Sequence, residues 1–184
     1  MTYLKNPPFD EKDFPSFAAI REQFGFVPNF FPEQIRRPDL MEAHINLMGT
    51  ILLKDGALLR RQKEYIFLVC SAANLSTYCV TAHCEIVRGL GLSGPEPEKI
   101  AVDHIHTDIP IADKALLNFI LKLNRQATKV GREDFDGLRT YGFSDEQILE
   151  AVVLTGLARF ANLVSAGLGA EADFEPKLLA LSQE

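Results

Sequence analysis

Apolar residues recur with helical spacing along most of the chain from residue 38 onward. Between residues 112 and 127, for example, leucine and isoleucine side chains recur three or four positions apart and form a stripe. Together with Gly and Pro stop signals, such patterns predict six helices: Pro38 to the residue before Lys54, Leu58–Ala73, Asn74 or Ser76 through Val87, Ala112–Ala127, Asp134–Tyr141, and Ser144 through Leu163 or beyond. No segment shows sustained period-two alternation, so the predicted fold class is all-α.

Two of these segments are especially apolar. Residues 65–73 are apolar nearly all round, which places that helix in the middle of the core. The most apolar window, residues 151–170, contains Arg159 and Asn162 well inside it. Since a charged side chain is costly inside a bilayer, a buried helix explains this window better than a membrane span. We therefore expect no membrane partner.

The first 38 residues have a different composition, dense in proline and phenylalanine. Prolines at that density interrupt helices, whereas the phenylalanines need a place to be buried. We predict an N-terminal arm over residues 1–38 with one short helix around Phe17–Phe24, followed by a helical domain over residues 39–184. The arm wraps the body of the subunit or a partner subunit, and plain intramolecular packing is an equally good explanation.

Composition and charge narrow the function. The chain is 47% hydrophobic and 24% charged, its net charge is −6 and its pI is near 5.3, so no nucleic-acid partner is expected. The start of the sequence lacks the apolar run of a signal peptide, and three cysteines without a secretory signal indicate thiols in a reducing compartment. The expected location is the cytoplasm.

Three local patterns carry less weight. Gly89–Gly94 matches G-x-G-x-x-G but follows a predicted helix, so we do not interpret it as a dinucleotide site. His104 and His106 could form a metal pair, but their flanks have loop character and no second pair of ligands is near, so solvent-exposed histidines and no metal are expected. No cofactor is expected either. The tail from Asp173 is acidic and predicted to be loose.

Glu64, Cys79 and His83 could carry chemistry together. Cys79 and His83 are four residues apart and share one helix face. Cys79 falls in the first turn of its helix, where unpaired N–H groups favour a thiolate. A neutral His83 could take the thiol proton, and a carboxylate could orient the imidazole. Spacing alone leaves open whether Glu64 reaches His83, and a packed cysteine, a structural histidine and a helix-capping glutamate explain the same residues.

The spacing of these residues resembles a known signature. Glu64 is followed by eleven residues and then by Ser76-Thr77-Tyr78-Cys79-Val80-Thr81-Ala82-His83. The chain resembles the alkylhydroperoxidase D-like (AhpD-like) branch of the carboxymuconolactone decarboxylase superfamily, in its peroxidase-related group, whose signature is Glu, eleven residues, then C-x-x-C-x-x-x-H. The resemblance extends to three further stretches, 25–29, 71–74 and 142–148.

This resemblance implies an AhpD-like helical bundle and a thiol peroxidase. Cys79 would attack a hydroperoxide substrate, while Glu64 and His83 would relay the proton. Ser76 stands where the resolving cysteine should be and cannot form the disulfide, although it could cap the helix or hydrogen-bond the thiolate. Tyr78 occupies a position where some members carry a second relay histidine. An external thiol or redox protein is therefore expected as reductant.

Two further cysteines and two alternative functions have to be compared with this interpretation. Cys84 lies on a different face of its helix from Cys79, and Cys70 is expected to be packed, so neither is a good replacement for the resolving thiol. The alternatives are a non-redox enzyme of the decarboxylase type, with His83 and Glu64 in acid–base roles, and a catalytically reduced oligomeric binding protein. The resemblance also implies a homo-oligomer, from dimer to hexamer.

Overall fold

The computed structural model describes residues 2–91 and 97–174. The described residues contain eight α-helices and no strand, which confirms the predicted all-α fold. The helices are α1 (Pro15–Phe24), α2 (Pro38–Met48), α3 (Arg60–Ala73), α4 (Thr77–Gly89), α5 (Pro97–Asp103), α6 (Ile111–Gln126), α7 (Arg132–Thr140) and α8 (Asp145–Leu168). A π-helical turn, Gly49–Leu53, directly continues α2.

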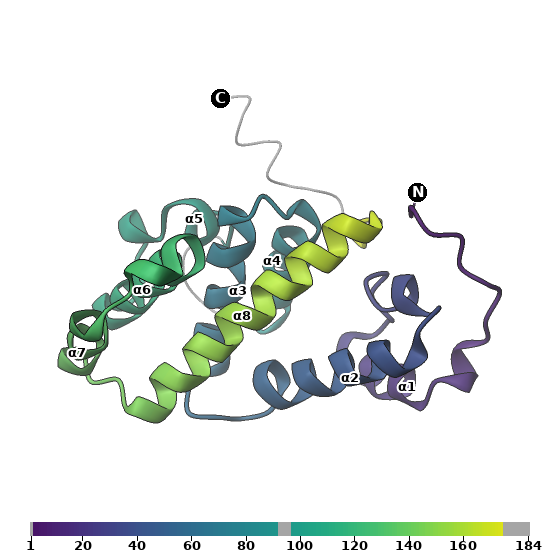
Figure 1. Cartoon of the computed structure of the whole chain (residues 1–184), viewed down its shortest axis with the longest axis horizontal. Coiled ribbons are helices and arrows are strands. Elements are labelled where there is room, and N and C mark those ends of the chain that lie inside the picture. Colours follow the sequence, from purple (N-terminus) through teal and green to yellow (C-terminus); the bar gives the residue numbers. More distant parts are fainter. Residues whose placement is uncertain (1, 92–96, 175–184) are drawn as a thin grey trace.

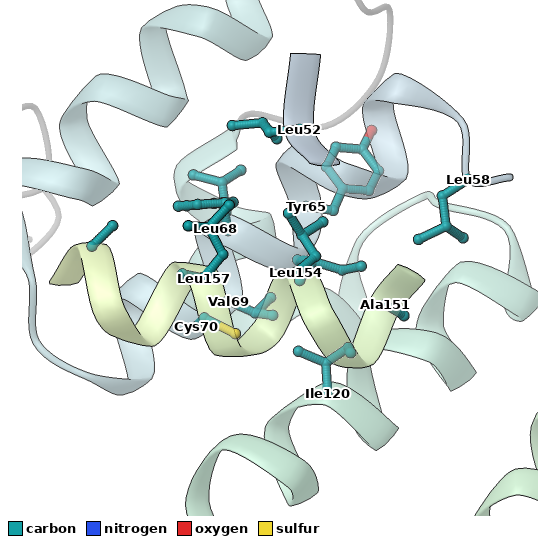
Figure 2. Packing of buried hydrophobic residues seen from close by; sticks show 14 of the residues in the cluster. Leu52, Leu58, Tyr65, Leu68, Val69, Cys70, Ile120, Ala151, Leu154 and Leu157 are labelled. Atoms are coloured by element: carbon teal, nitrogen blue, oxygen red, sulfur yellow. The ribbon is translucent and has the colours of Figure 1, made fainter. Parts of the chain in front are cut away.

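Helix α3 is the centre of the molecule, as its apolar sequence predicts. It packs against α4, α5, α6 and α8, and every residue from Gln62 to Ser71 is buried. Figure 2 shows Val69 and Cys70 of α3 beside Leu154 and Leu157 of α8. In Figure 1, α8 crosses the front of this core, with α6 and α7 at one side and α1 and α2 at the other. Helices α4, α5, α6 and α8 thus surround α3.

Local signals set several helix boundaries. Ser144 forms the capping box that the sequence suggests: its hydroxyl accepts from the Gln147 backbone N–H at 3.2 Å, and the Gln147 side chain accepts from the Ser144 N–H at 2.9 Å. Helix α8 ends at Gly169, whose φ of 67° is the left-handed conformation that glycine tolerates best. Ser76 directly precedes α4, but its side chain makes no capping hydrogen bond. Ser76 therefore occupies the N-cap position of α4, but the predicted capping hydrogen bond from its side chain is wrong.

Three local expectations are corrected. Helix α5 was not predicted, because the glycines and prolines before it indicate a loop. His104 is buried rather than exposed, and its Nε2 lies 2.9 Å from the Asn118 side-chain oxygen, whereas His106 is exposed and contacts Asp103. Asp173 is held by hydrogen bonds rather than loose, whereas the tail beyond Phe174 and Gly94 of the glycine motif lie outside the described residues.

Helix α8 is buried on one side only. Its inner face packs on α3 and α6, but only 44% of its most apolar 18-residue stretch is buried. It is the one helix in the described part of the chain that is long and apolar enough to cross a membrane, with a mean hydropathy of 1.5. Its inner face fits the predicted core helix, whereas several large apolar residues on its outer face are exposed.

The N-terminal residues contribute to the same core. Phe17 and Ile20 of α1 are buried, as are Phe30, Phe31 and Ile35 in the segment before α2. These side chains join the apolar cluster formed by the later helices. Whether residues 1–38 form a unit of their own stays a prediction.

Candidate active site

A short turn between α3 and α4 brings Glu64 to His83. The turn spans residues 74–76, and Leu75 takes a positive φ of 57° in it. The ring of Phe67 stacks on that of His83 with centroids 4.3 Å apart, so the second turn of α3 lies beside the middle of α4. Glu64 is one turn before Phe67 and therefore meets His83 rather than the start of α4, which answers the geometric question that spacing left open.

Glu64 is completely buried and holds two partners. Its Oε2 lies 2.6 Å from His83 Nδ1, and its Oε1 accepts from Arg60 Nε at 2.8 Å and lies 2.7 Å from Arg60 Nη2. Burial by itself raises the pKa of Glu64, but His83 and Arg60 outweigh it and hold that pKa below its ordinary value. Glu64 is therefore an ionised carboxylate at neutral pH.

The carboxylate fixes the orientation of the imidazole. With Nδ1–H donating to Glu64, a neutral His83 carries its lone pair on Nε2. That nitrogen can accept a proton, and the buried negative charge behind the ring stabilises the imidazolium that forms. The arrangement of Glu64 and His83 is that of a general base with an orienting carboxylate.

Cys79 lies in the first turn of α4, in contact with a hydroxyl group. It is buried, and its Sγ is 3.5 Å from Oγ of Ser165 on α8. Oγ of Ser165 is also 3.4 Å from that of Ser76 and donates to the backbone carbonyl of Asn162 at 3.1 Å. Sequence reasoning missed Ser165, because it lies 86 residues from Cys79 and belongs to no recognisable motif.

Cys79 and His83 line the same apolar pocket, of about 70 Å³. Its wall is built mainly from large apolar side chains of the N-terminal residues, α2 and the π turn, among them Phe24, Phe30, Ile45, Met48 and Leu52. Phe24, Pro28, Ala82 and Ile86 also line a wider hollow of about 530 Å³, which Arg60 borders. The pocket thus adjoins the wider hollow, and a thiol and an imidazole are among the groups that line it.

Tyr78 ties the pocket wall to the end of the described chain. Its hydroxyl donates to the Asp173 carboxylate at 2.6 Å and accepts from the Phe30 backbone N–H at 3.0 Å, while its ring stacks on Phe30. Asp173 also accepts from the Asn29 backbone N–H at 3.0 Å. Burial and the Asp173 contact raise the pKa of Tyr78, so it stays protonated and anchors Phe30 in the pocket wall.

The other two cysteines differ from Cys79 in their surroundings. Cys70 and Cys84 are buried members of the apolar core, and no disulfide joins the three thiols. Burial raises the pKa of Cys70 to about 12, so its thiol is inert at neutral pH. Neither residue lines the pocket that holds Cys79.

Comparison with solved structures identifies the fold. A peroxidase-related protein of Ralstonia eutropha JMP134, described as an alkylhydroperoxidase AhpD core, superposes with a TM-score of 0.86 at 29% identity, covering 94% of this chain and 92% of that one. This chain has the AhpD-like fold. The predicted resemblance to AhpD-like proteins is thereby confirmed.

Two further AhpD-like structures are informative. A peroxidase-related protein of Silicibacter sp. TM1040 matches with a TM-score of 0.86 at 24% identity, covering 95% of this chain and 93% of that one. A variant of the debrominase Bmp8, in complex with 2,3,4-tribromopyrrole, matches with a TM-score of 0.80 at 21% identity over the full length of both chains. No family model and no curated protein matches this chain. The AhpD-like fold thus occurs in peroxidase-related proteins and in a dehalogenating enzyme.

Proposed function

We propose that this chain is a thiol-dependent hydroperoxide reductase of the AhpD-like type. The observation that carries the proposal is the placement of Cys79 and His83 in one apolar pocket, with the buried Glu64 carboxylate 2.6 Å behind the imidazole. A nucleophile, a base and a group that orients the base are the components of an activated thiol. The similarity to solved structures of peroxidase-related proteins supports the same function.

The proposed reaction uses these three residues in turn. His83 Nε2 takes the thiol proton, and the Cys79 thiolate attacks the terminal oxygen of a hydroperoxide. An S–O bond forms and the O–O bond breaks, so that sulfur becomes a sulfenic acid and the substrate is reduced. The leaving alkoxide takes the proton held by His83 and departs as the alcohol. An external thiol then attacks the sulfenic sulfur and releases water, and a second thiol reduces the resulting mixed disulfide.

The hydroxyl groups beside Cys79 suit a one-cysteine cycle. Ser76 occupies the position of the resolving cysteine but contacts Ser165 rather than capping α4. Ser165 can accept from the Cys79 thiol and, after a rotation of its O–H bond, donate to the thiolate. Ser76 can donate to Ser165 in that state, which strengthens the chain of hydrogen bonds. The pair would therefore stabilise the Cys79 thiolate before it attacks the hydroperoxide.

Dimedone trapping tests the proposal. After one equivalent of an apolar hydroperoxide such as cumene hydroperoxide, we expect one dimedone adduct on Cys79, formed without an internal disulfide and absent in Cys79→Ser. Cys84→Ser is the matched control, because Cys84 is a buried cysteine of the same helix that does not line the pocket. A folded protein with no Cys79 adduct would exclude peroxidase chemistry and favour the non-redox or binding functions.

A second candidate function is thiol-dependent dehalogenation of a small haloaromatic. The favouring observation is the pocket itself, because its lining is almost wholly apolar and aromatic and it presents a single thiol. The thiolate would take the halogen from carbon, carbon would gain a proton, and a second thiol would then displace halide and leave a disulfide. Incubation with 2,3,4-tribromopyrrole and a thiol, followed by bromide measurement, separates the two candidates.

A further inference from the structure

The outer face of α8 carries an exposed apolar seam, in which Phe160 also contacts the His44 ring of α2. Its members are spaced four, three, four, three and four residues apart: Leu149, Val153, Gly156, Phe160, Leu163 and Gly167. This is the spacing with which two helices pack along one seam. All six residues are exposed, and Leu149 and Leu163 expose 63% and 74% of their surface. An uninterrupted line of exposed apolar residues on one helix indicates a binding surface.

The two glycines in the seam have no function within the chain. A Cβ built on Gly156 or Gly167 would meet no atom within 4 Å, so packing inside the subunit does not require glycine there. Gly156 lies in the interior of α8, where glycine costs about 1 kcal/mol relative to alanine, and Gly167 lies in the last turn of the helix. A glycine on a helix face allows another backbone to approach closely. The seam is therefore suited to contact with another helix.

We propose that the seam binds the α8 helix of a second copy of this chain, in an antiparallel pair around a two-fold axis at Gly156. The symmetry follows from the residue numbers. Leu149 and Leu163 lie seven residues on either side of Gly156, so each Leu163 meets the partner's Leu149. Val153 and Phe160 lie three and four residues away on opposite sides, so they also face each other across the axis. The seam is thus complementary to itself, as an isologous contact requires.

Charge supports the antiparallel direction. Asp145 and Glu146 lie in the first turn of α8. At the other end of the helix, Leu168 shares a groove of about 540 Å³ with Arg36 and Arg37. Within the chain Arg139 already pairs with Asp145, and Asp39 with Arg37, so the charges that an antiparallel pair brings together are those of Glu146 and the second copy's Arg36.

The groove also supplies surface area. An α8 of 24 residues is roughly 36 Å long and roughly 10 Å wide, and the resulting face of roughly 360 Å² is less than half of the about 800 Å² per partner that a stable interface buries. The groove beside it adds the exposed apolar side chains of Leu40 and Leu47 from α2. The proposed interface therefore consists of the α8 seam and this groove.

Light scattering at micromolar concentration, together with paired charge variants, tests the proposal. The parent should show twice the 20.5 kDa chain mass or a higher even multiple, and Leu163→Glu should at least halve it. Adding Leu149→Lys to Leu163→Glu should restore the mass, because residues 149 and 163 are roughly 21 Å apart within one helix and can pair only between copies. Val102→Glu, at an exposed apolar position of α5, is the control and should change nothing.

A cysteine at the axis tests the position of the two-fold. Gly156→Cys should form a disulfide between copies under mild oxidation, because that bond requires Cα atoms about 4.4–6.8 Å apart. Arg159→Cys, exposed on the same helix but off the seam, should not. A monomeric parent, an unchanged mass in Leu163→Glu, or a dimeric Gly156→Cys without the bond would overturn the proposal. A monomer that binds phosphatidylcholine vesicles through Leu163 would overturn it in favour of a membrane-surface role.

Discussion

Substitution of Glu64 by glutamine is the most direct test of the proposed proton relay. The carboxylate contacts Arg60 through Oε1 and His83 through Oε2. Glu64→Gln keeps the shape but removes the charge and one acceptor. If the amide oxygen accepts from His83, the amide nitrogen faces Arg60, donor against donor. If the amide is turned the other way, its nitrogen can donate to His83 Nδ1 only when the imidazole carries its proton on Nε2, and that nitrogen then cannot act as the base.

The expected loss of stability can be worked out from these contacts. A hydrogen bond to a charged group contributes about 1.5–3 kcal/mol, so the free energy of unfolding should fall by about 2–3 kcal/mol at pH 7. The difference should depend on pH. Because the folded-state pKa of Glu64 lies below the ordinary value of 4.5, the carboxylate stabilises the fold above that pH, and this contribution disappears as the pH falls through the folded-state pKa. Urea unfolding of the parent and Glu64→Gln should therefore converge below pH 4.5.

The effect on chemistry should be larger than the effect on folding. Without the carboxylate, His83 loses the charge that orients it and stabilises its protonated form. We expect the rate of Cys79 oxidation by hydroperoxide to fall about 100-fold, within the range that positioned acid–base groups contribute. Quenched-flow sampling followed by intact-mass analysis measures the rate of Cys79 oxidation, at a pH where both proteins are folded.

Glu98→Gln is the matched control for Glu64→Gln. Glu98 is also a buried carboxylate that is ion-paired with an arginine, Arg88, but it lies on α5 and does not line the pocket. Glu98→Gln should lower stability without slowing Cys79 oxidation. If Glu64→Gln oxidises Cys79 as fast as the parent, or if both variants are slowed equally, the relay is wrong.

Three further predictions concern neighbouring groups. Ser165→Ala should slow the alkylation of Cys79 by iodoacetamide about 10-fold, as expected for losing a hydrogen bond to a charged group, and Ser165→Thr should retain most of the rate. Ser76→Cys should form a disulfide with Cys79 after one equivalent of peroxide, seen as a loss of two hydrogens in intact mass. The disulfide should protect Cys79 from sulfinate formation, so an overoxidised Cys79 with no disulfide would contradict the prediction. Burial lowers the pKa of His44 from 6.5 to about 4, so the unfolded chain binds the proton first as the pH falls, and the parent should lose about 3 kcal/mol of stability between pH 6.5 and 4. In His44→Phe that loss should be absent from urea unfolding, and an equal loss in both proteins would refute the assignment.

The sequence by itself determined all but one of the described helices and the residues of the proposed relay. Helical periodicity and local stop signals depend on neighbours a few residues apart, so they predict α3, α4, α6 and α8 within a few residues of their observed ends. The one helix that was missed, α5, is short and follows a stretch of glycines and prolines whose local signals indicate a loop. Glu64, Cys79 and His83 could be named because their spacing matches a signature.

Only the tertiary structure decided how those residues are used. The turn after α3 sets which residue of α4 faces Glu64, and spacing alone could not distinguish the start of α4 from its middle. Ser165 reaches Cys79 from 86 residues away, and Asp173 reaches Tyr78 from 95 residues away. Such contacts depend on how helices cross, which no local pattern contains. The same reason applies to α8: its composition is apolar all along, but only the packing of α3 and α6 against it decided which side is core and which side remains exposed.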